Sequence, residues 1–252
     1  MLWKKTLAIV AGTITISACS VYHPQAVDIP LMSQSGETKI DASVSLSGHV
    51  IPTKMALNAT ATHAFNDWIA GQAHVNYGSG MGAAQLAFGA YKPLGEHAVF
   101  EGYMGLNSGF MSVDNASVSS EENADGSTTT TRHAKTYSYD GRFNVPFSQV
   151  NFGWHDLTRV HIDIGVGFKA GSYIPNLHYY EYDRDEVRID ERTEHYTKPN
   201  LLLEPQMVLR LGSQHVKWNF KAGFCYLNDI NESLTHLTYD FYSLSTGIQI
   251  NF

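Results

Sequence analysis

The feature that most constrains this chain is an alternation of apolar and polar residues that recurs in segments of about ten residues. In the segment IDASVSLS, residues 40–47, Ile40 and Val44 alternate with Asp41 and Ser45. Successive side chains of a β-strand point to opposite faces, so this pattern predicts strands with one apolar and one polar face. Little helical periodicity competes with it, and no run of about 18 apolar residues offers a helix that spans a bilayer.

Ten segments follow this pattern, although the sixth is less regular and Pro146 is interpreted as a bulge that shifts its alternation. They lie at about residues 40–47, 57–62, 69–77, 86–90, 98–106, 133–153, 160–169, 203–211, 216–226 and 242–252. Over residues 37–252 the pattern resembles that of bacterial outer-membrane β-barrel proteins, whose strand number is even. We therefore predict an all-β fold, a transmembrane antiparallel up-and-down β-barrel of about ten strands, with eight and twelve as alternative counts.

The chain ends inside the tenth segment, SLSTGIQINF, at Phe252. In a closed barrel the last strand pairs with the first, so the chain can stop within the hydrogen-bonded ladder. The terminal aromatic residue also resembles the signal that the outer-membrane assembly machinery reads. A soluble barrel such as a lipocalin is the alternative, but the apolar face of the last four segments is almost free of charge, as contact with lipid requires.

The first residues resemble a bacterial export signal. Lys4 and Lys5 precede an apolar stretch at residues 7–16 that is too short to span a membrane. The residues before and at Cys19 resemble the lipobox of lipoproteins, which implies cleavage before Cys19 and covalent lipid on it. Ser20 favours sorting to the outer membrane by the same resemblance, and an ordinary secretory signal is the alternative.

We therefore predict a lipoprotein signal peptide at residues 1–18 and a lipid-anchored periplasmic tether at residues 19–36. Folding of this segment into the lumen as a plug is the alternative. Loss of Lys4 and Lys5 changes the net charge from −7 to −9, which argues against binding nucleic acid through a basic surface. Cys19 and Cys225 are the two cysteines, so we expect no disulfide framework, no metal site and no cofactor beyond the lipid.

The lengths of the connections predict how the barrel is oriented. If the first strand starts in the periplasm, the long connections at about 112–132, 173–199 and 227–239 all face outward, as in bacterial barrels. Trp68, Trp154 and Trp218 then fall at the periplasmic strand ends, where interfacial rings are favoured. The stretch 112–132 is acidic and rich in small residues, so we expect a mobile loop there.

The alternation also predicts a set of charged side chains in the lumen, five positive and five negative. These are Asp41, Glu101, Asp140, Arg142, Asp163, Lys169, Glu204, Arg210, Lys217 and Lys221. A balanced set predicts a network of ion pairs, and a barrel of this size has little room beyond its own side chains.

A filled lumen and the absence of a recognised catalytic motif favour a structural, accessory or binding component beside a larger outer-membrane complex. A narrow channel for small solutes or ions is one alternative. A second is a hydrolase using His178, Asp183, Asp190 and His195, because a turn near residues 186–187 opposes the two histidines and the two acids. Alternating charges of this kind more often form a solvated hairpin. No motif matches the omptin proteases, lipid A deacylases, palmitoyl transferases or the outer-membrane phospholipase.

Overall fold

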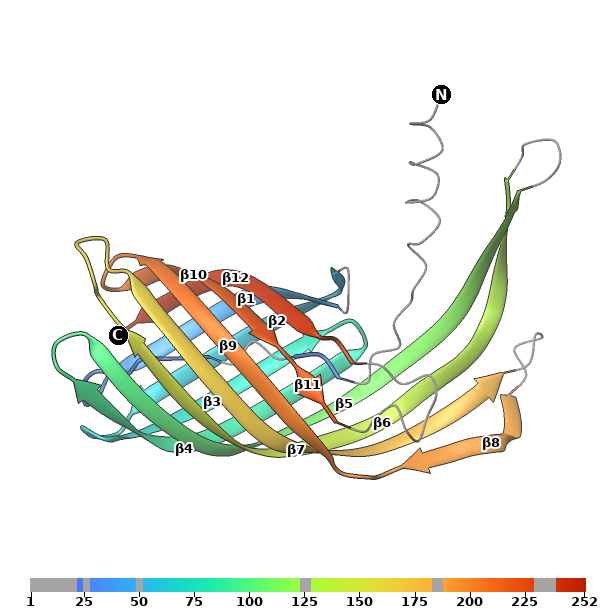
Figure 1. Ribbon diagram of the computed structural model, residues 1–252, viewed down its shortest axis with the longest axis horizontal. Helices are drawn as coiled ribbons and strands as arrows, with labels where there is room; N and C mark the ends of the chain where they lie inside the picture. The colour runs from blue at the N-terminus through green and yellow to red at the C-terminus, as the bar shows by residue number, and fades with distance from the viewer. Residues whose placement is uncertain (1–21, 25–27, 49–51, 123–127, 183–187, 229–238) are drawn as a thin grey trace.

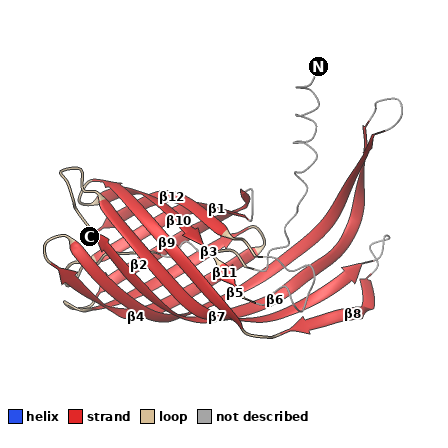
Figure 2. Cartoon of the chain, viewed as in Figure 1, coloured by secondary structure: helices blue, strands red, loops and turns tan. Residues whose placement is uncertain are grey.

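The computed structural model describes residues 22–24, 28–48, 52–122, 128–182, 188–228 and 239–252. Within them the chain forms strands joined by turns and connections (Figure 2), and none of them belongs to a helix long and apolar enough to cross a membrane. The strands are β1 (Thr38–Gly48), β2 (Pro52–Ala64), β3 (Ile69–Gly78), β4 (Met81–Leu94), β5 (Ala98–Glu122), β6 (Thr128–Trp154), β7 (Asp163–Tyr182), β8 (Arg188–Tyr196), β9 (Asn200–Gly212), β10 (Val216–Phe224), β11 (Tyr226–Leu227) and β12 (Tyr242–Asn251).

Ten strands close into an antiparallel barrel, which confirms the predicted fold class. They are β1–β7, β9, β10 and β12, while β8 pairs with the far end of β7 and β11 adds two residues beside β9. The ring closes where β1 pairs with β12, with Lys39 opposite Asn251. The backbone N–H of Phe252 donates to the carbonyl of Thr38 at 2.9 Å. The last strand therefore ends within the ladder and leaves no free sheet edge there.

The two ends of the barrel differ (Figure 1). One end carries the turns at residues 65–68, 95–97, 155–162 and 213–215, and we call it the short-turn end. The other end carries the extended β5–β6 and β7–β8 hairpins, and we call it the long-hairpin end. Trp68, Trp154 and Trp218 all lie near the short-turn end with exposed rings, as their sequence positions predicted.

The expected mobile loop at 112–132 is corrected by the structure. β5 continues to Glu122 and β6 begins at Thr128, so the two strands project past the barrel as one long hairpin. Val118 pairs with Arg132 and Glu121 with Thr129. The β-branched run at 128–131 fits a pleated sheet well, and this preference outweighs the small polar composition that suggested a loop.

The two faces of the strands differ as the alternation predicted. On β1, Ile40 and Leu46 point outward and are 42% and 44% exposed, whereas Asp41 and Ser43 point into the lumen and are buried. The same division holds around the ring, where exposed outward side chains include Val75, Phe88, Met104, Val166, Met207, Phe220 and Ile248. An apolar exterior around a polar interior is the arrangement that a lipid bilayer requires of a barrel.

Pro146 does not shift the alternation of β6, so the expected bulge is wrong. Asn144 pairs with Ile174 and Phe147 with Gly171, which is one uninterrupted register on both sides of the proline. Proline lacks only its own N–H donor, and the strand accommodates it without an inserted residue. The lumen face of β6 near its middle therefore carries apolar side chains. The charged residues that precede Pro146, Asp140 and Arg142, lie on the outward face.

Candidate functional site

The described part of the N-terminal segment lies inside the barrel. We call residues 22–24 and 28–33 the plug; Figure 1 shows them in dark blue within the ring of strands. Tyr22, Ile29 and Leu31 have no exposed surface. The segment therefore follows the plug alternative in its described part and is not a free tether. Its apolar side chains give the physical reason, because burying them in the lumen removes them from water.

Charged and polar side chains of the barrel wall hold the backbone of the plug. Each of five consecutive plug residues, from Asp28 to Met32, has a main-chain atom in a hydrogen bond with the wall. The bonds are Gln149 Nε2 to the oxygen of Asp28 (3.0 Å), Arg210 Nη2 to Ile29 (2.7 Å), Lys39 Nζ to Pro30 (2.9 Å) and to Leu31 (2.7 Å), and the N–H of Met32 to Glu101 Oε1 (2.7 Å). Hydrogen bonds that involve an ionised group are stronger than neutral ones. Because such bonds reach consecutive main-chain atoms of the plug, the wall binds this segment along its backbone.

The side chains of the plug fill space left by small wall residues. Ile29 and Leu31 pack with Val99 and Val208 in one buried apolar cluster. Gly167 on β7 faces this cluster, and a Cβ atom there would lie 3.1 Å from Cδ1 of Ile29 and 2.7 Å from Oδ1 of the wall residue Asn151. A larger residue at this position would compete with the plug for the same volume.

Asp28 stands at the centre of the buried charges. Its Oδ1 accepts a hydrogen bond from Arg210 Nη2 at 2.9 Å and lies 3.3 Å from Lys221 Nζ. Lys221 also contacts Asp41 at 2.8 Å. All four residues are buried, so the carboxylate of the plug compensates cations that water does not solvate.

Tyr22 fixes the other part of the plug nearer the long-hairpin end. Its hydroxyl donates to Glu204 Oε1 at 3.1 Å, and Glu204 also pairs with Lys169 at 3.0 Å. The ring packs edge-on against Phe143 and Tyr173, with centroids 5.9 and 5.4 Å away. An aromatic ring with a paired hydroxyl gives a buried anchor that is both apolar and directional.

His23 and Asp240 form a second anchor beside Tyr22. Nδ1 of His23 lies 2.5 Å from Oδ2 of Asp240, which also accepts a hydrogen bond from the Ser47 hydroxyl at 2.7 Å. Asp240 lies two residues before the start of β12, and Ser47 is the penultimate residue of β1, so both belong to the long-hairpin end. Asp240 N–H also donates to the carbonyl of Tyr22 at 3.0 Å.

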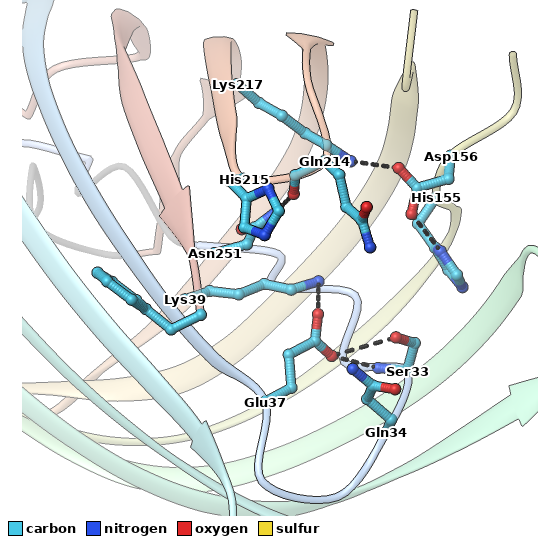
Figure 3. A pocket seen from close by; sticks show the side chains of 11 residues that line it. Ser33, Gln34, Glu37, Lys39, His155, Asp156, Gln214, His215, Lys217 and Asn251 are labelled. Carbon is cyan, nitrogen blue, oxygen red and sulfur yellow. Dashed lines mark hydrogen bonds and ion pairs between the residues drawn. The ribbon is translucent and has the colours of Figure 1, made fainter. Parts of the chain in front are cut away.

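A polar pocket opens at the short-turn end, with an empty volume of about 740 Å³ that includes open solvent. Figure 3 shows two groups of ion pairs in its wall. Lys39 pairs with Glu37 at 3.0 Å on one side, and Lys217 pairs with Asp156 at 2.8 Å on the other. Lys217 also contacts buried Asp163 at 2.6 Å, so the cations of the pocket are already compensated by carboxylates.

Asp156 lies in the turn between β6 and β7, outside the strands. Partial burial alone would raise the pKa of Asp156, but hydrogen bonds from Lys217 and His155, with a further one from His161, hold that pKa well below its usual range. The carboxylate therefore stays ionised and secures this turn to β10.

The structure places eight of the ten predicted lumen charges in the interior. They are Asp41, Glu101, Asp163, Lys169, Glu204, Arg210, Lys217 and Lys221. Asp140 and Arg142 are corrected, because they lie on the exposed outward face of β6, where the uninterrupted register at Pro146 puts them. Sequence reasoning missed Asp28 and Lys39. The signal for Lys39 was its inward parity with Asp41, and the signal for Asp28 was the apolar run directly after it.

The candidates in the outer hairpin are only partly brought together. His178 on β7 pairs with His195 on β8, as predicted, and with Asp140 on β6. A register shift after Tyr179 then breaks the continuous pairing that opposition of Asp183 and Asp190 requires. Asp183, and also Cys19 with the signal at 1–18, lie outside the described residues, and the side chains of Asp190 and His195 are not described.

Comparisons with known proteins identify the fold. No family model and no curated protein matches the sequence. The structure is similar to the outer membrane protease OmpT from Escherichia coli, with a TM-score of 0.55 and 10% identity over 86% of this chain and 97% of that chain. The chain has an outer-membrane β-barrel fold. A second similar structure of the outer-membrane barrel class is the KdgM porin, with a TM-score of 0.39 and 10% identity over 85% and 99% of the two chains. At such identity the likeness of this outer-membrane barrel to OmpT shows the fold alone and not an activity.

Proposed function

We propose that this outer-membrane barrel is sealed by its own plug and serves as an accessory or binding component through its projecting hairpins. The observation that carries the proposal is the plug itself, with buried Asp28 between Arg210 and Lys221 in the lumen. In the orientation that we propose, the long-hairpin end faces outward, because bacterial barrels have short periplasmic turns and longer outer loops. Covalent lipid on Cys19 is part of the proposal, and labelling with radioactive palmitate that Cys19→Ser abolishes would support it.

A filled lumen argues against transport of solutes as the main role. A solute crossing the barrel would have to displace the plug from charged partners that are themselves buried, and each uncompensated charge costs several kcal/mol. We therefore expect the full chain to show no discrete conductance steps in planar bilayers. Regular steps whose ion preference shifts in the Lys217→Gln and Lys221→Gln variants would instead support the narrow channel.

The projecting hairpins are the part of the barrel that a partner can reach. β5 and β6 stay paired from the barrel out to Glu122 and Thr128, and β7 continues as a hairpin with β8. Replacing residues 116–135 with a short turn removes the first projection and leaves the barrel register. The described pairs of these residues join them to one another, as in Ala116 with Lys135, and the pairing of β6 with β7 begins at Tyr137.

Copurification of the two forms from detergent-solubilised membranes tests this role. The full chain should retain a reproducible outer-membrane partner that the trimmed chain loses. Heat-modifiable mobility on gels should be the same for both, which shows that the trimmed barrel is folded. Equal recovery of every protein with both forms would contradict the accessory role.

One observation favours a hydrolase as a second candidate. The strand register pairs Asp140 on β6 with His178 on β7, and His178 with His195 on β8, and an acid beside a histidine can activate water. The test is hydrolysis of peptide and phospholipid substrates by the full chain. Activity that His178→Ala removes, and that an exposed control such as Lys198→Ala keeps, would support catalysis in place of the accessory role.

A further inference from the structure

The plug runs through the lumen in a definite direction. β1 begins at the short-turn end, and Ser33 lies there too, because its N–H donates to Glu37 at 2.7 Å. Tyr22 and His23 lie at the opposite end, beside Asp240. A fully extended chain from Tyr22 to Ser33 spans at most about 36–40 Å, which exceeds the thickness of roughly 30 Å of a bilayer core. The segment is therefore long enough to cross the membrane inside the barrel.

Both ends of the plug are held by contacts that fix this direction. At the long-hairpin end the backbone of Asp240 bonds to the backbone of Tyr22 at 3.0 Å, and its side chain pairs with His23. At the short-turn end the N–H of Met32 bonds to Glu101, which lies near the start of β5. Reversing the plug would separate every one of these pairs.

We propose that the chain before Tyr22, including Cys19, emerges from the barrel at the cell surface and not in the periplasm. Cys19 is three residues from Tyr22, so it lies within about 11 Å of it and cannot reach the short-turn end. A lipid on Cys19 would then belong to the outer side of the membrane. This inference rests on the proposed orientation of the barrel, and it replaces the periplasmic anchor expected from the sequence.

The geometry also implies how the barrel is assembled. The lumen around the plug is packed with charged side chains, so acyl chains on Cys19 cannot be drawn through it after closure. The ring is closed by the pairing of the first strand, β1, with the last strand, β12. The threading proposal therefore requires the segment to be in the lumen before the ring is complete.

The experiment places a short epitope at one of three positions in the full chain, expressed in cells. The first position is between Ser20 and Val21. The second is the β7–β8 connection at the long-hairpin end, and the third is the β4–β5 turn at Gly95 on the short-turn end. Exposed loop tips tolerate such insertions. Antibody binding is measured on intact cells and on cells with a permeabilised outer membrane, with heat-modifiable mobility as the check of folding.

We expect the epitope after Ser20 to bind antibody on intact cells as strongly as the β7–β8 epitope does. The epitope at Gly95 should bind only after permeabilisation. If the epitope after Ser20 needs permeabilisation while the β7–β8 epitope does not, the threading proposal is overturned. If the Gly95 epitope binds antibody on intact cells and the β7–β8 epitope does not, the proposed orientation is wrong. Threading would then still require the epitope after Ser20 to bind antibody under the same conditions as the β7–β8 epitope, that is, only after permeabilisation.

A cross-link in the purified full chain tests threading without any insertion. In a His23→Cys and Asp240→Cys variant, oxidation should join two residues 217 positions apart and change the mobility of the denatured chain. The matched pair His23→Cys and Glu96→Cys should not cross-link, because Glu96 is in a turn at the short-turn end. Cross-linking to residue 96 and not to residue 240 would refute the direction of the plug.

Discussion

Replacing Asp28 with asparagine should release the plug while the barrel wall stays intact. Asp28→Asn keeps the size of the side chain and removes the carboxylate that pairs with Arg210 at 2.9 Å. Lys221 keeps Asp41 as a partner, but the guanidinium of Arg210 is left buried beside a neutral amide. Removing one partner of a buried ion pair typically costs about 3–5 kcal/mol. At 1.36 kcal/mol per factor of ten, the ratio of inserted to released plug should fall by about two to four orders of magnitude.

Two assays on folded protein in detergent or lipid report this ratio. Limited proteolysis should cut the segment around Asp28 much faster in the variant, while the strands stay protected. Planar bilayers should show conductance steps for Asp28→Asn and none for the full-length parent. Glu96→Gln is the matched control, because it also neutralises an acid but at an exposed position, where a substitution changes stability by at most about 0.5 kcal/mol.

A double-mutant cycle with Arg210→Met separates the ion pair from other effects of the substitution. If the pair is the cause, the double variant should be less impaired than the sum of the single variants, by about 0.5–3 kcal/mol. Proteolysis and conductance of Asp28→Asn that match those of Glu96→Gln, together with additive effects in the cycle, would refute the reasoning.

Three further substitutions test other parts of the structure. Gly167→Val should loosen the plug and raise its proteolysis, because the added atoms enter the space of the plug, whereas Gly102→Val, with no atom within 4 Å of its Cβ position, should not. Asp156→Asn should lower the urea midpoint at pH 7 but not near pH 1. A carboxylate whose folded-state pKa is depressed stabilises the folded protein at pH values above the ordinary pKa of about 3.9, and this stabilisation is lost as the pH falls through the lower folded-state pKa. A difference in urea midpoint between parent and variant that stays the same from pH 7 to pH 1 would contradict the role of the charge. Val75→Arg places a charge on the lipid-facing side and should cost about 2–4 kcal/mol in unfolding titrations in lipid. Arg142→Gln changes an exposed position between exposed Asp140 and Asn144 and should cost at most about 0.5 kcal/mol. Equal effects would contradict the assignment of the apolar face.

The alternation of side chains was enough to predict the fold and much of the lumen. A one-residue shift in a strand turns every side chain to the other face, so each correctly assigned strand placed its charges correctly. Asp163, Lys169 and Arg210 were assigned to the lumen in this way. Only the sixth strand failed, because Pro146 was given a bulge that the backbone did not need.

The contacts of the plug could not be predicted from the alternation of side chains. Residues 22–24 and 28–33 form no strand and have no period, so no pattern shows which surface they contact. Their partners lie far away in the sequence, as in the contact between Asp28 and Arg210, 182 positions apart. The Tyr22 anchor likewise depends on the closed ring, because Glu204 meets it only after β9 has joined β7.

The balance of charges shows that the wall and the plug depend on each other. Among the described residues the buried wall cations are Lys39, Lys169, Arg210, Lys217 and Lys221, and the buried acids on the strands are Asp41, Glu101, Asp163 and Glu204. The strand cations Lys39, Lys169 and Lys217 each have a carboxylate partner in Glu37, Glu204 and Asp163, whereas the described ion pair of Arg210 is with Asp28 of the plug. Lys39 Nζ also donates to two plug carbonyls and Arg210 Nη2 to one, so an empty lumen would leave those donors without these protein partners as well. The wall of this barrel is thus complementary to an extended chain carrying one acid, and the residues directly before β1 have that composition.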